Sequence, residues 1–485
     1  MTAQCIMVLG TTSGAGKSWL TTALCRWYAN QGLRVAPFKA QNMSNNARVV
    51  ANAEGGFGEI GSAQYFQALA ARAEPDVRMN PLLLKPEADT RSQVVLMGHV
   101  DAELSAMPWR GRSLKVWPHI AEALDALRAA NDVVVIEGAG SPAEINLHDS
   151  DVVNMRVALH SNARCLLVTD IDRGGAFAHL YGTWALLPDN ERALLKGFVL
   201  NKFRGDASLL APAPRMLLEK TGVPVVATIP MQWNHGLPEE DGVFDDRSHG
   251  SAGAVHTRVA VIAYPRISNL DEFQPLKNVH GVRLQWARSP ADVEGADWII
   301  LPGSKATAAD LAWLRAQGLD AAIAAHAARG GMVLGVCGGL QMLGEALIDT
   351  EGVDGNAAGL GLLPLVTSFE ARKTVRLTET QLGEVRGAWS RLAGVPLRGY
   401  EIHHGQTAQH PAMAEAGDKV HEVVPGLAWQ NAKGNVLGLY LHGMFEDANV
   451  LEALFGTDVL TLDAVFERMA QGIGQWFDPA ALALD

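Results

Sequence analysis

A glycine-rich segment near the N-terminus has the residue types of a phosphate-binding loop. Gly10–Ser18 reads Gly-Thr-Thr-Ser-Gly-Ala-Gly-Lys-Ser and separates an apolar run from an amphipathic run. A helix that begins there presents unpaired backbone N–H groups and the positive end of its dipole to an anion. In such a loop Lys17 reaches the terminal phosphates of a nucleotide and Ser18 holds Mg²⁺. Because the usual first glycine is replaced by Thr11, we interpret the segment as a variant loop of an ATP site.

Two further segments are expected to complete this site. Val133–Gly140 (VVVIEGAG) runs from an apolar strand into Glu137 and then into glycines. A carboxylate at the carboxyl end of a parallel strand, beside a phosphate loop, is well placed for a metal, so Ser18 and Glu137 are the predicted metal ligands. Asn201 and Lys202 follow another apolar strand and are expected near the adenine. The predicted ATP-binding residues are Thr11, Thr12, Ser13, Gly14, Gly16, Lys17, Ser18, Asn201 and Lys202.

A second constellation in the C-terminal half is typical of nucleophilic catalysis by cysteine. Met332–Gly339 (MVLGVCGG) places Cys337 at the end of an apolar strand, directly before a segment that can begin a helix. This is the G-x-C-x-G form of the nucleophile elbow, in which small residues let a tight turn expose the side chain. The positive helix end lowers the pKa of the thiol, and the Gly338 N–H is placed to stabilise an oxyanion.

A cysteine nucleophile needs a base. His442 follows the apolar run Val436–Leu441, again at a strand end, so it can approach Cys337 across adjacent strands. His403 and His404 are competing candidates. The loop after another apolar strand, Leu301–Lys305, is expected to supply the second oxyanion donor through the Gly303 N–H.

These residues need a scaffold of buried parallel strands. Short apolar runs, many of them rich in β-branched residues, alternate with helical patterns through both halves of the chain. We therefore predict an α/β fold with two tandem domains, each a mostly parallel sheet with helices on both faces. Residues 1–250 form the nucleotide domain, including a linker from about 231, and residues 251–485 form the cysteine-containing domain. The predicted strands are Cys5–Leu9, Leu33–Phe38, Val133–Ile136, Cys165–Val168, Phe198–Leu200, Val223–Ile229, Val259–Ala263, Trp298–Leu301, Met332–Val336 and Val436–Leu441.

Composition narrows the class of protein. The 485 residues are 48% hydrophobic and 19% charged, which is enough apolar material for two cores. A formal net charge of −12 argues against a general nucleic-acid or anionic-membrane surface. No apolar run approaches the ~18–20 residues that span a bilayer. Four scattered cysteines indicate no disulfide framework. We expect a cytoplasmic protein with no nucleic-acid or membrane partner; its oligomeric state stays open.

Several motifs together resemble a known family. The loop is similar to that of dethiobiotin synthetase-like ATP-dependent enzymes, which activate a carboxylate. The C-terminal features resemble class I glutamine amidotransferase domains of the cobyrinate/cobyrate type. The chain as a whole resembles the cobyric acid synthase family. The stretches that carry this likeness are Phe38–Asn46, Gly58–Gln64, Asn80–Pro86, Val168–Gly175 and Asn201–Asp206.

This resemblance implies a glutamine-hydrolysing amidoligase of cobalamin biosynthesis, with ATP and Mg²⁺ as cofactors and glutamine as nitrogen donor. It further implies amidation of the b, d, e and g carboxylates of a corrinoid, adenosylcobyrinic acid a,c-diamide. Lys39, Gln41, Asn42 and Asn45 are the expected substrate-binding residues. Many class I members carry an acid two residues after the catalytic histidine, where this chain has Met444. We therefore expect a Cys337–His442 dyad, or an orienting carboxylate from elsewhere, for which Glu446 and Glu401 are candidates.

Two other functions are compatible with parts of this pattern. A cobyrinic acid a,c-diamide synthase performs the same chemistry at different carboxylates, although the Gln41–Asn46 and Gly58–Gln64 stretches favour the first interpretation. A nucleotide-switched partition ATPase also uses a variant phosphate loop. Such proteins carry a lysine early in the loop, where this chain has Thr11 and Thr12, and they lack a cysteine elbow.

Overall fold

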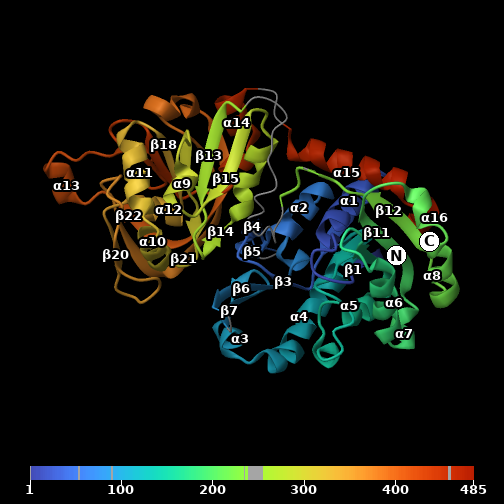
Figure 1. The fold of residues 1–485 in the computed structure, drawn as a ribbon. Coiled ribbons are helices and arrows are strands. Elements are labelled where there is room, and N and C mark those ends of the chain that lie inside the picture. The colour runs from blue at the N-terminus through green and yellow to red at the C-terminus, as the bar shows by residue number, and fades with distance from the viewer. Residues whose placement is uncertain are drawn as a thin grey trace. The chain divides into compact units, whose positions relative to one another are not determined.

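The chain folds into two compact units (Figure 1). A computed structural model describes residues 2–52, 55–88, 91–233, 235–238, 255–456 and 460–484. The first unit comprises Met1–Ser44, Val50–Leu237 and Leu462–Asp485, and the second comprises Asn45–Val49 and Pro238–Thr461. Residues 234 and 239–253 of the predicted linker lie outside the described residues.

The first unit is built on a parallel six-stranded sheet. Its strand order is β12-β11-β10-β1-β9-β2, and every neighbouring pair is parallel. The strands are β1 (Gln4–Gly10), β2 (Val35–Phe38), β9 (Val133–Glu137), β10 (Arg164–Asp170), β11 (Leu195–Phe203) and β12 (Val225–Pro230). Successive side chains of a strand point to opposite faces, and nearly every residue of β1, β9 and β10 is buried. Both faces of this sheet are therefore covered, as the continuous apolar runs predicted.

Helices and a smaller sheet complete the first unit. The helices of eight or more residues are α1 (Lys17–Ala29), α2 (Ser62–Ala70), α4 (Trp109–Ala130), α6 (Ala176–Leu186), α8 (Ala213–Thr221) and α15 (Leu462–Trp476). The smaller sheet has the order β3-β6-β7-β8, and its strands are β3 (Gln41–Met43), β6 (Leu82–Ala88), β7 (Arg91–Leu96) and β8 (His99–Val100). This sheet was not predicted, because β3 and β8 have only three and two residues, too few to show a strand pattern.

The second unit has a seven-stranded sheet with the order β15-β13-β16-β18-β25-β24-β23. Its strands are β13 (Thr257–Ile262), β15 (Val282–Ala287), β16 (Trp298–Leu301), β18 (Met332–Val336), β23 (His421–Val424), β24 (Ala428–Gln430) and β25 (Val436–Leu439). The pairs from β15 to β25 are parallel, and β24 and β23 extend that edge in the antiparallel direction. The α/β class and the mostly parallel sheets are thus confirmed.

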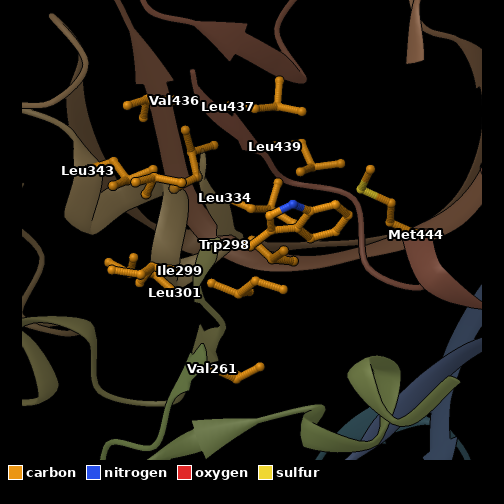
Figure 2. Packing of buried hydrophobic residues seen from close by; sticks show 14 of the residues in the cluster. Val261, Trp298, Ile299, Leu301, Leu334, Leu343, Val436, Leu437, Leu439 and Met444 are labelled. Atoms are coloured by element: carbon orange, nitrogen blue, oxygen red, sulfur yellow. The ribbon is translucent and has the colours of Figure 1, made fainter. Parts of the chain in front are cut away.

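The central strands of the second unit carry its core. Val261, Ile299, Leu334 and Leu437 come from four neighbouring strands and pack into one buried cluster (Figure 2). Met444, which follows His442 by two residues, is 1% exposed and belongs to the same cluster. At the position where many class I amidotransferase domains carry an acid, this chain therefore has a buried core side chain.

The alanine-rich stretch 306–329, whose composition favours one long helix, forms two helices. These are α10 (Thr307–Ala316) and α11 (Leu319–Ala328). Gly318 separates them with φ of +73°, a left-handed conformation that ends a helix and that glycine adopts without a steric penalty. A four-stranded sheet with the order β20-β19-β21-β22 was also not predicted; its short strands are β19 (Ala346–Asp349) and β20 (Ala357–Ala358). It contains the long strands β21 (Val366–Gln381) and β22 (Pro396–Ala408), which form an antiparallel pair.

The unit boundaries differ from the predicted division at 250/251 in two places. Residues 462–485 were expected in the second domain, but they pack with the first unit, where α15 lies along α1 (Figure 1). Asn45–Val49 was expected in the first domain, but it belongs to the second unit. Helical spacing shows that Leu462–Trp476 has an apolar face, but it does not show which of the two hydrophobic cores this face packs against.

Within the described residues, no helix is both long enough and apolar enough to cross a bilayer.

A buried arginine holds the C-terminal helix on the first unit. The Arg26 side chain is 1% exposed and pairs with Asp463 at 2.7 Å and with Glu467 at 2.8 Å. It also donates to the Ala70 carbonyl at 2.8 Å, and its guanidinium lies 5.5 Å from the centre of the Phe466 ring.

Replacing this arginine should loosen the helix. Arg26→Met removes the buried donor to the Ala70 carbonyl and one partner each of Asp463 and Glu467, so we expect the first unit to lose about 2 kcal/mol of unfolding free energy. Urea unfolding followed by circular dichroism measures the change. The control is Arg34→Met, because the Arg34–Asp132 pair is exposed and should not affect the midpoint. Equal midpoints for the two variants would contradict this role of Arg26.

Candidate active sites

The glycine-rich loop lies between β1 and α1, as predicted. Gly14 and Gly16 have φ of +73° and +99°, which favours glycine at both positions. A Cβ atom on Gly16 would lie 2.0 Å from Asn201 Nδ2, so a larger residue also clashes there. Helix α1 begins at Lys17 with no side-chain cap and no acid in its first turn. Its first N–H groups are therefore not taken by a capping side chain, and the end of the helix is suited to bind phosphate.

The side chain of Lys17 folds back over the glycine-rich loop. Its Nζ donates to the carbonyl oxygens of Thr12 and Gly140, each at 3.1 Å. The residue is only 7% exposed, and a Cβ atom on Gly10 would lie 2.9 Å from its Nζ. The ammonium group is thus held at the loop by main-chain oxygens.

The predicted metal ligands are in contact with each other. Glu137 ends β9, is 1% exposed, and accepts a hydrogen bond from Ser18 Oγ at 2.8 Å. Lys39 Nζ lies 2.8 Å from the same Oε1 atom, and Gln67 Nε2 donates to Oε2 at 2.5 Å. Burial by itself raises the pKa of Glu137, but Lys39 and these hydrogen bonds outweigh it and lower the pKa below its usual range. The carboxylate is therefore charged, as metal binding requires.

Asn201 and Lys202 contact the main chain of the loop. Asn201 Nδ2 donates to the Ala15 carbonyl at 2.8 Å, and Lys202 Nζ donates to the Gly14 carbonyl at 2.8 Å. Lys202 Nζ also lies 3.2 Å from the carboxylate of Asp170, which ends β10 and is 5% exposed. Their contact with the adenine stays a prediction. The sequence analysis did not assign a role to Asp170, although its place at a strand end was a usable signal.

The four predicted substrate residues are divided between the two units. Lys39 contacts Glu137, as described above. Asn42 Nδ2 donates to Gln64 Oε1 at 3.1 Å. Gln41 is 9% exposed, and its Oε1 has no hydrogen-bond donor among the described residues. Asn45 belongs to the second unit.

In the second unit, Cys337 occupies the turn between β18 and α12 (Gly338–Leu343). Its φ of +52° and ψ of −107° are strained for a non-glycine residue, as a nucleophile elbow requires. A Cβ atom on Gly339 would lie 1.8 Å from the Leu301 carbonyl, so only glycine fits behind the elbow. Cys337 is 5% exposed, and its Sγ donates to the Ile402 carbonyl at 3.6 Å.

The two predicted oxyanion residues are at this elbow. A Cβ atom on Gly338 would lie 2.8 Å from the Ser304 nitrogen, which shows how closely the Gly303–Ser304 segment approaches the turn. A Cβ atom on Gly303 would lie 2.9 Å from Cε1 of His442. The tertiary structure thus brings Gly303, Gly338, Cys337 and His442 together.

His442 is held by a carboxylate that the sequence analysis did not consider. Its Nδ1 lies 2.9 Å from Glu272 Oε1, and the Gly443 N–H donates to Glu272 Oε2 at 2.9 Å. His442 and Glu272 side chains are each 1% exposed. Burial disfavours the charged ring, but Glu272 and the hydrogen-bonded Cys337 outweigh it and raise the pKa of His442 to about 10. The arrangement is Cys337–His442–Glu272 rather than a dyad.

The two acids predicted for this role have other partners. Glu401 accepts from Arg376 Nε at 2.7 Å and lies 3.1 Å from His403 Nε2. Glu446 lies 2.5 Å from Arg48 Nη2. His403 Nδ1 faces the Gly405 carbonyl at 2.8 Å, and His404 Nδ1 faces the Glu370 carbonyl at 3.0 Å. Because Glu272 precedes His442 by 170 residues, spacing near the histidine did not reveal it.

Comparison with known proteins gives a match for each half of the chain. Residues 6–241 match the family model of the CobQ/CobB/MinD/ParA nucleotide binding domain, and residues 258–450 match the CobB/CobQ-like glutamine amidotransferase domain. Cobyric acid synthase of Paracidovorax citrulli (strain AAC00-1) is 80% identical over 99% of this chain and 98% of its own length. That of Acidovorax sp. (strain JS42) is 82% identical over 99% and 97% of the two chains. That of Variovorax paradoxus (strain S110) is 75% identical over 99% of each.

The chain belongs to the cobyric acid synthase family. The predicted resemblance is therefore confirmed, and so is the predicted class of enzyme, a glutamine-dependent amidoligase of cobalamin biosynthesis. The use of ATP and glutamine follows from the two matched domains, and the substrate is a small corrinoid.

The pKa of His442 gives a first test of its environment. The Glu272 carboxylate favours the protonated ring, so Glu272→Gln should lower the pKa of His442 from about 10 by at least ~1 unit. The variant ring then loses its proton at lower pH than the wild-type ring. NMR titration of isotope-labelled histidine rings measures this, with the His442 signal assigned by its loss in His442→Ala. Glu401→Gln is the control and should leave the His442 titration unchanged. Equal shifts in both variants would contradict the assignment.

Proposed function

We propose that this enzyme amidates the b, d, e and g carboxylates of adenosylcobyrinic acid a,c-diamide, giving adenosylcobyric acid. The observation that carries the proposal is the presence of two reaction centres in one chain of this family. One is a phosphate loop with a charged acid at its side, and the other is a cysteine elbow with a buried histidine–glutamate pair.

We propose that the first unit activates the substrate carboxylate with ATP. The phosphate loop cradles the phosphates, and Lys17 offsets the charge on the transferring phosphoryl group. The hydroxyl of Ser18 and the carboxylate of Glu137 fit Mg²⁺, which prefers oxygen ligands and commonly takes one or two carboxylates together with phosphate oxygens. When bound there, Mg²⁺ neutralises phosphate charge. Asn201 and Lys202 keep the loop in shape through its carbonyl groups.

We propose that the second unit releases ammonia from glutamine. The Cys337 thiolate attacks the amide carbon, and the N–H groups of Gly303 and Gly338 stabilise the resulting oxyanion. The protonated ring of His442 gives its proton to the departing ammonia, and water then hydrolyses the thioester. Glu272 holds the ring in place and stabilises its charged form. Ammonia displaces phosphate from the activated carboxylate to form the amide.

We further propose that Lys39, Gln41, Asn42 and Asn45 serve the corrinoid side of the reaction. The unpaired Oε1 of the buried Gln41 supports this, because a buried polar atom without a partner costs free energy unless a ligand or water satisfies it. Lys39, which contacts Glu137, is placed at the phosphate end of this group. We place the enzyme in the cytoplasm, where ATP and glutamine are available and its four unpaired cysteines stay reduced.

Two variants separate the two reaction centres. Cys337→Ala should abolish glutamine-supported amide formation and spare the reaction supplied with ammonium, because only ammonia release needs the thiolate. Lys17→Ala should remove both activities, because carboxylate activation precedes amide formation. Product formation is measured by chromatography with each nitrogen source. Loss of the ammonium-supported reaction in Cys337→Ala, or full activity in Lys17→Ala, would contradict this division.

The number of amides added identifies the substrate. Incubation with the a,c-diamide, ATP, Mg²⁺ and glutamine should give a product that carries four new amides, as measured by mass spectrometry. An enzyme that instead accepts cobyrinic acid and adds two amides is an a,c-diamide synthase, which would overturn the proposed substrate.

A further inference from the structure

A short segment from the N-terminal half of the sequence is part of the second unit. Asn45–Val49 is joined to it by two reciprocal hydrogen bonds: the Ala47 N–H donates to Asn269 Oδ1 at 2.9 Å, and the Leu270 N–H donates to Asn46 Oδ1 at 3.0 Å. Both bonds fall just before Glu272 in the sequence. The segment is therefore attached next to the residue that holds His442.

Arg48 is the buried centre of this segment. Its side chain is 0% exposed, and its Nη2 lies 2.7 Å from Asp271 Oδ2 and 2.5 Å from Glu446 Oε1. Its guanidinium carbon lies 5.2 Å from the centre of the Tyr400 ring. One cation thus contacts two buried carboxylates and the face of an aromatic ring.

Each of these three partners is connected to His442. Asp271 precedes Glu272, whose carboxylate holds the ring nitrogen. The Tyr400 ring stacks on the His442 ring, with centres 5.3 Å apart and planes inclined by 17°, and the two residues exchange backbone hydrogen bonds of 2.9 and 3.2 Å. The Glu446 N–H donates to the Gly443 carbonyl at 2.9 Å. Arg48 therefore acts on His442 indirectly, through Asp271, Glu446 and Tyr400, and not at the reacting atoms.

We propose that Arg48 is a positioning residue for His442, so that the ammonia-releasing site is complete only when a residue from the N-terminal half is in place. This proposal rests on the glutaminase mechanism given above. Without the guanidinium, Asp271 and Glu446 become unpaired buried acids beside Glu272, and the Tyr400 ring loses the cation on its face. Both changes displace the His442 ring from the Cys337 thiolate.

The test compares Arg48→Met and Arg48→Lys in the full-length enzyme. In Arg48→Met we expect the glutaminase kcat to fall by about 10–100-fold, because a misplacement of ~1 Å can cost a factor of 100. KM for glutamine and ammonium-supported amide formation should each stay within about twofold, since the partners described for Arg48 all belong to the second unit and act on His442 rather than on the activation of the carboxylate. Arg48→Lys should recover part of kcat, because it keeps the charge but not the planar fork that spans two acids.

Arg26→Met is the matched control. Arg26 is also a buried arginine paired with two carboxylates, but its partners belong to the first unit, whereas the cysteine elbow belongs to the second. We expect it to keep the wild-type glutaminase kcat.

Three results would overturn the proposal. The first is an Arg48→Met kcat equal to that of Arg26→Met. The second is a loss of glutaminase and ammonium-supported activity in equal proportion, which indicates a general structural role. The third, which applies if Arg48→Met does not fold, is an Arg48→Lys enzyme whose kcat is unchanged. A failure of the underlying mechanism is recognised separately, by glutaminase activity that survives in Cys337→Ala.

Discussion

The second unit depends on one buried ion pair, between Glu272 and the ring of His442. A carboxylate and an imidazole that are both 1% exposed stabilise each other, because neither charge is solvated there. Glu272 uses its second oxygen for the Gly443 N–H, so the ring and the turn that carries it are held by one side chain. The pKa of the ring is thereby raised to about 10, so the ring keeps its proton near neutral pH.

Both reaction centres lie at the carboxyl ends of buried parallel strands. Strand interiors in these sheets are covered on both faces, and a polar side chain there would lose its hydrogen bonds to water. At the strand ends the chain turns, helix N-termini begin, and polar groups find partners. In the first unit this edge carries the phosphate loop, Glu137 and Asp170, and in the second unit it carries Cys337 and His442.

Each unit includes one segment from the opposite half of the sequence: Leu462–Asp485 belongs to the first unit, and Asn45–Val49 belongs to the second. A buried arginine binds each of these segments to its unit. Arg26 receives the C-terminal helix through Asp463 and Glu467. Arg48 inserts into the second unit through Asp271 and Glu446. Arginine suits this task because its planar fork reaches two carboxylates at once and stays charged when buried. Glu446 itself is buried, and this burial, together with the charges of Asp271 and Glu272, outweighs Arg48 and raises the pKa of Glu446 to about 7.

The sequence by itself determined the fold class and most residues of the two candidate sites. Continuous apolar runs predicted the central strands, and the residues at their ends predicted the loop around Lys17, the Ser18–Glu137 contact and the elbow at Cys337. These signals are local, because a strand, a turn and a helix start each depend on neighbouring residues.

What only the tertiary structure decided is long-range pairing. Glu272 lies 170 residues from His442 in the sequence. Arg48 lies 223 residues from Asp271 and 398 from Glu446. In the C-terminal helix, Asp463 and Glu467 lie 437 and 441 residues from Arg26. Spacing along the chain carries no information about such contacts, because they are selected by the burial of charge in a packed core. Glu401 and Glu446 lay nearer to His442 in sequence, yet Arg376 and Arg48 hold them elsewhere. The orienting acid was therefore decided by which carboxylate the fold buries beside the ring.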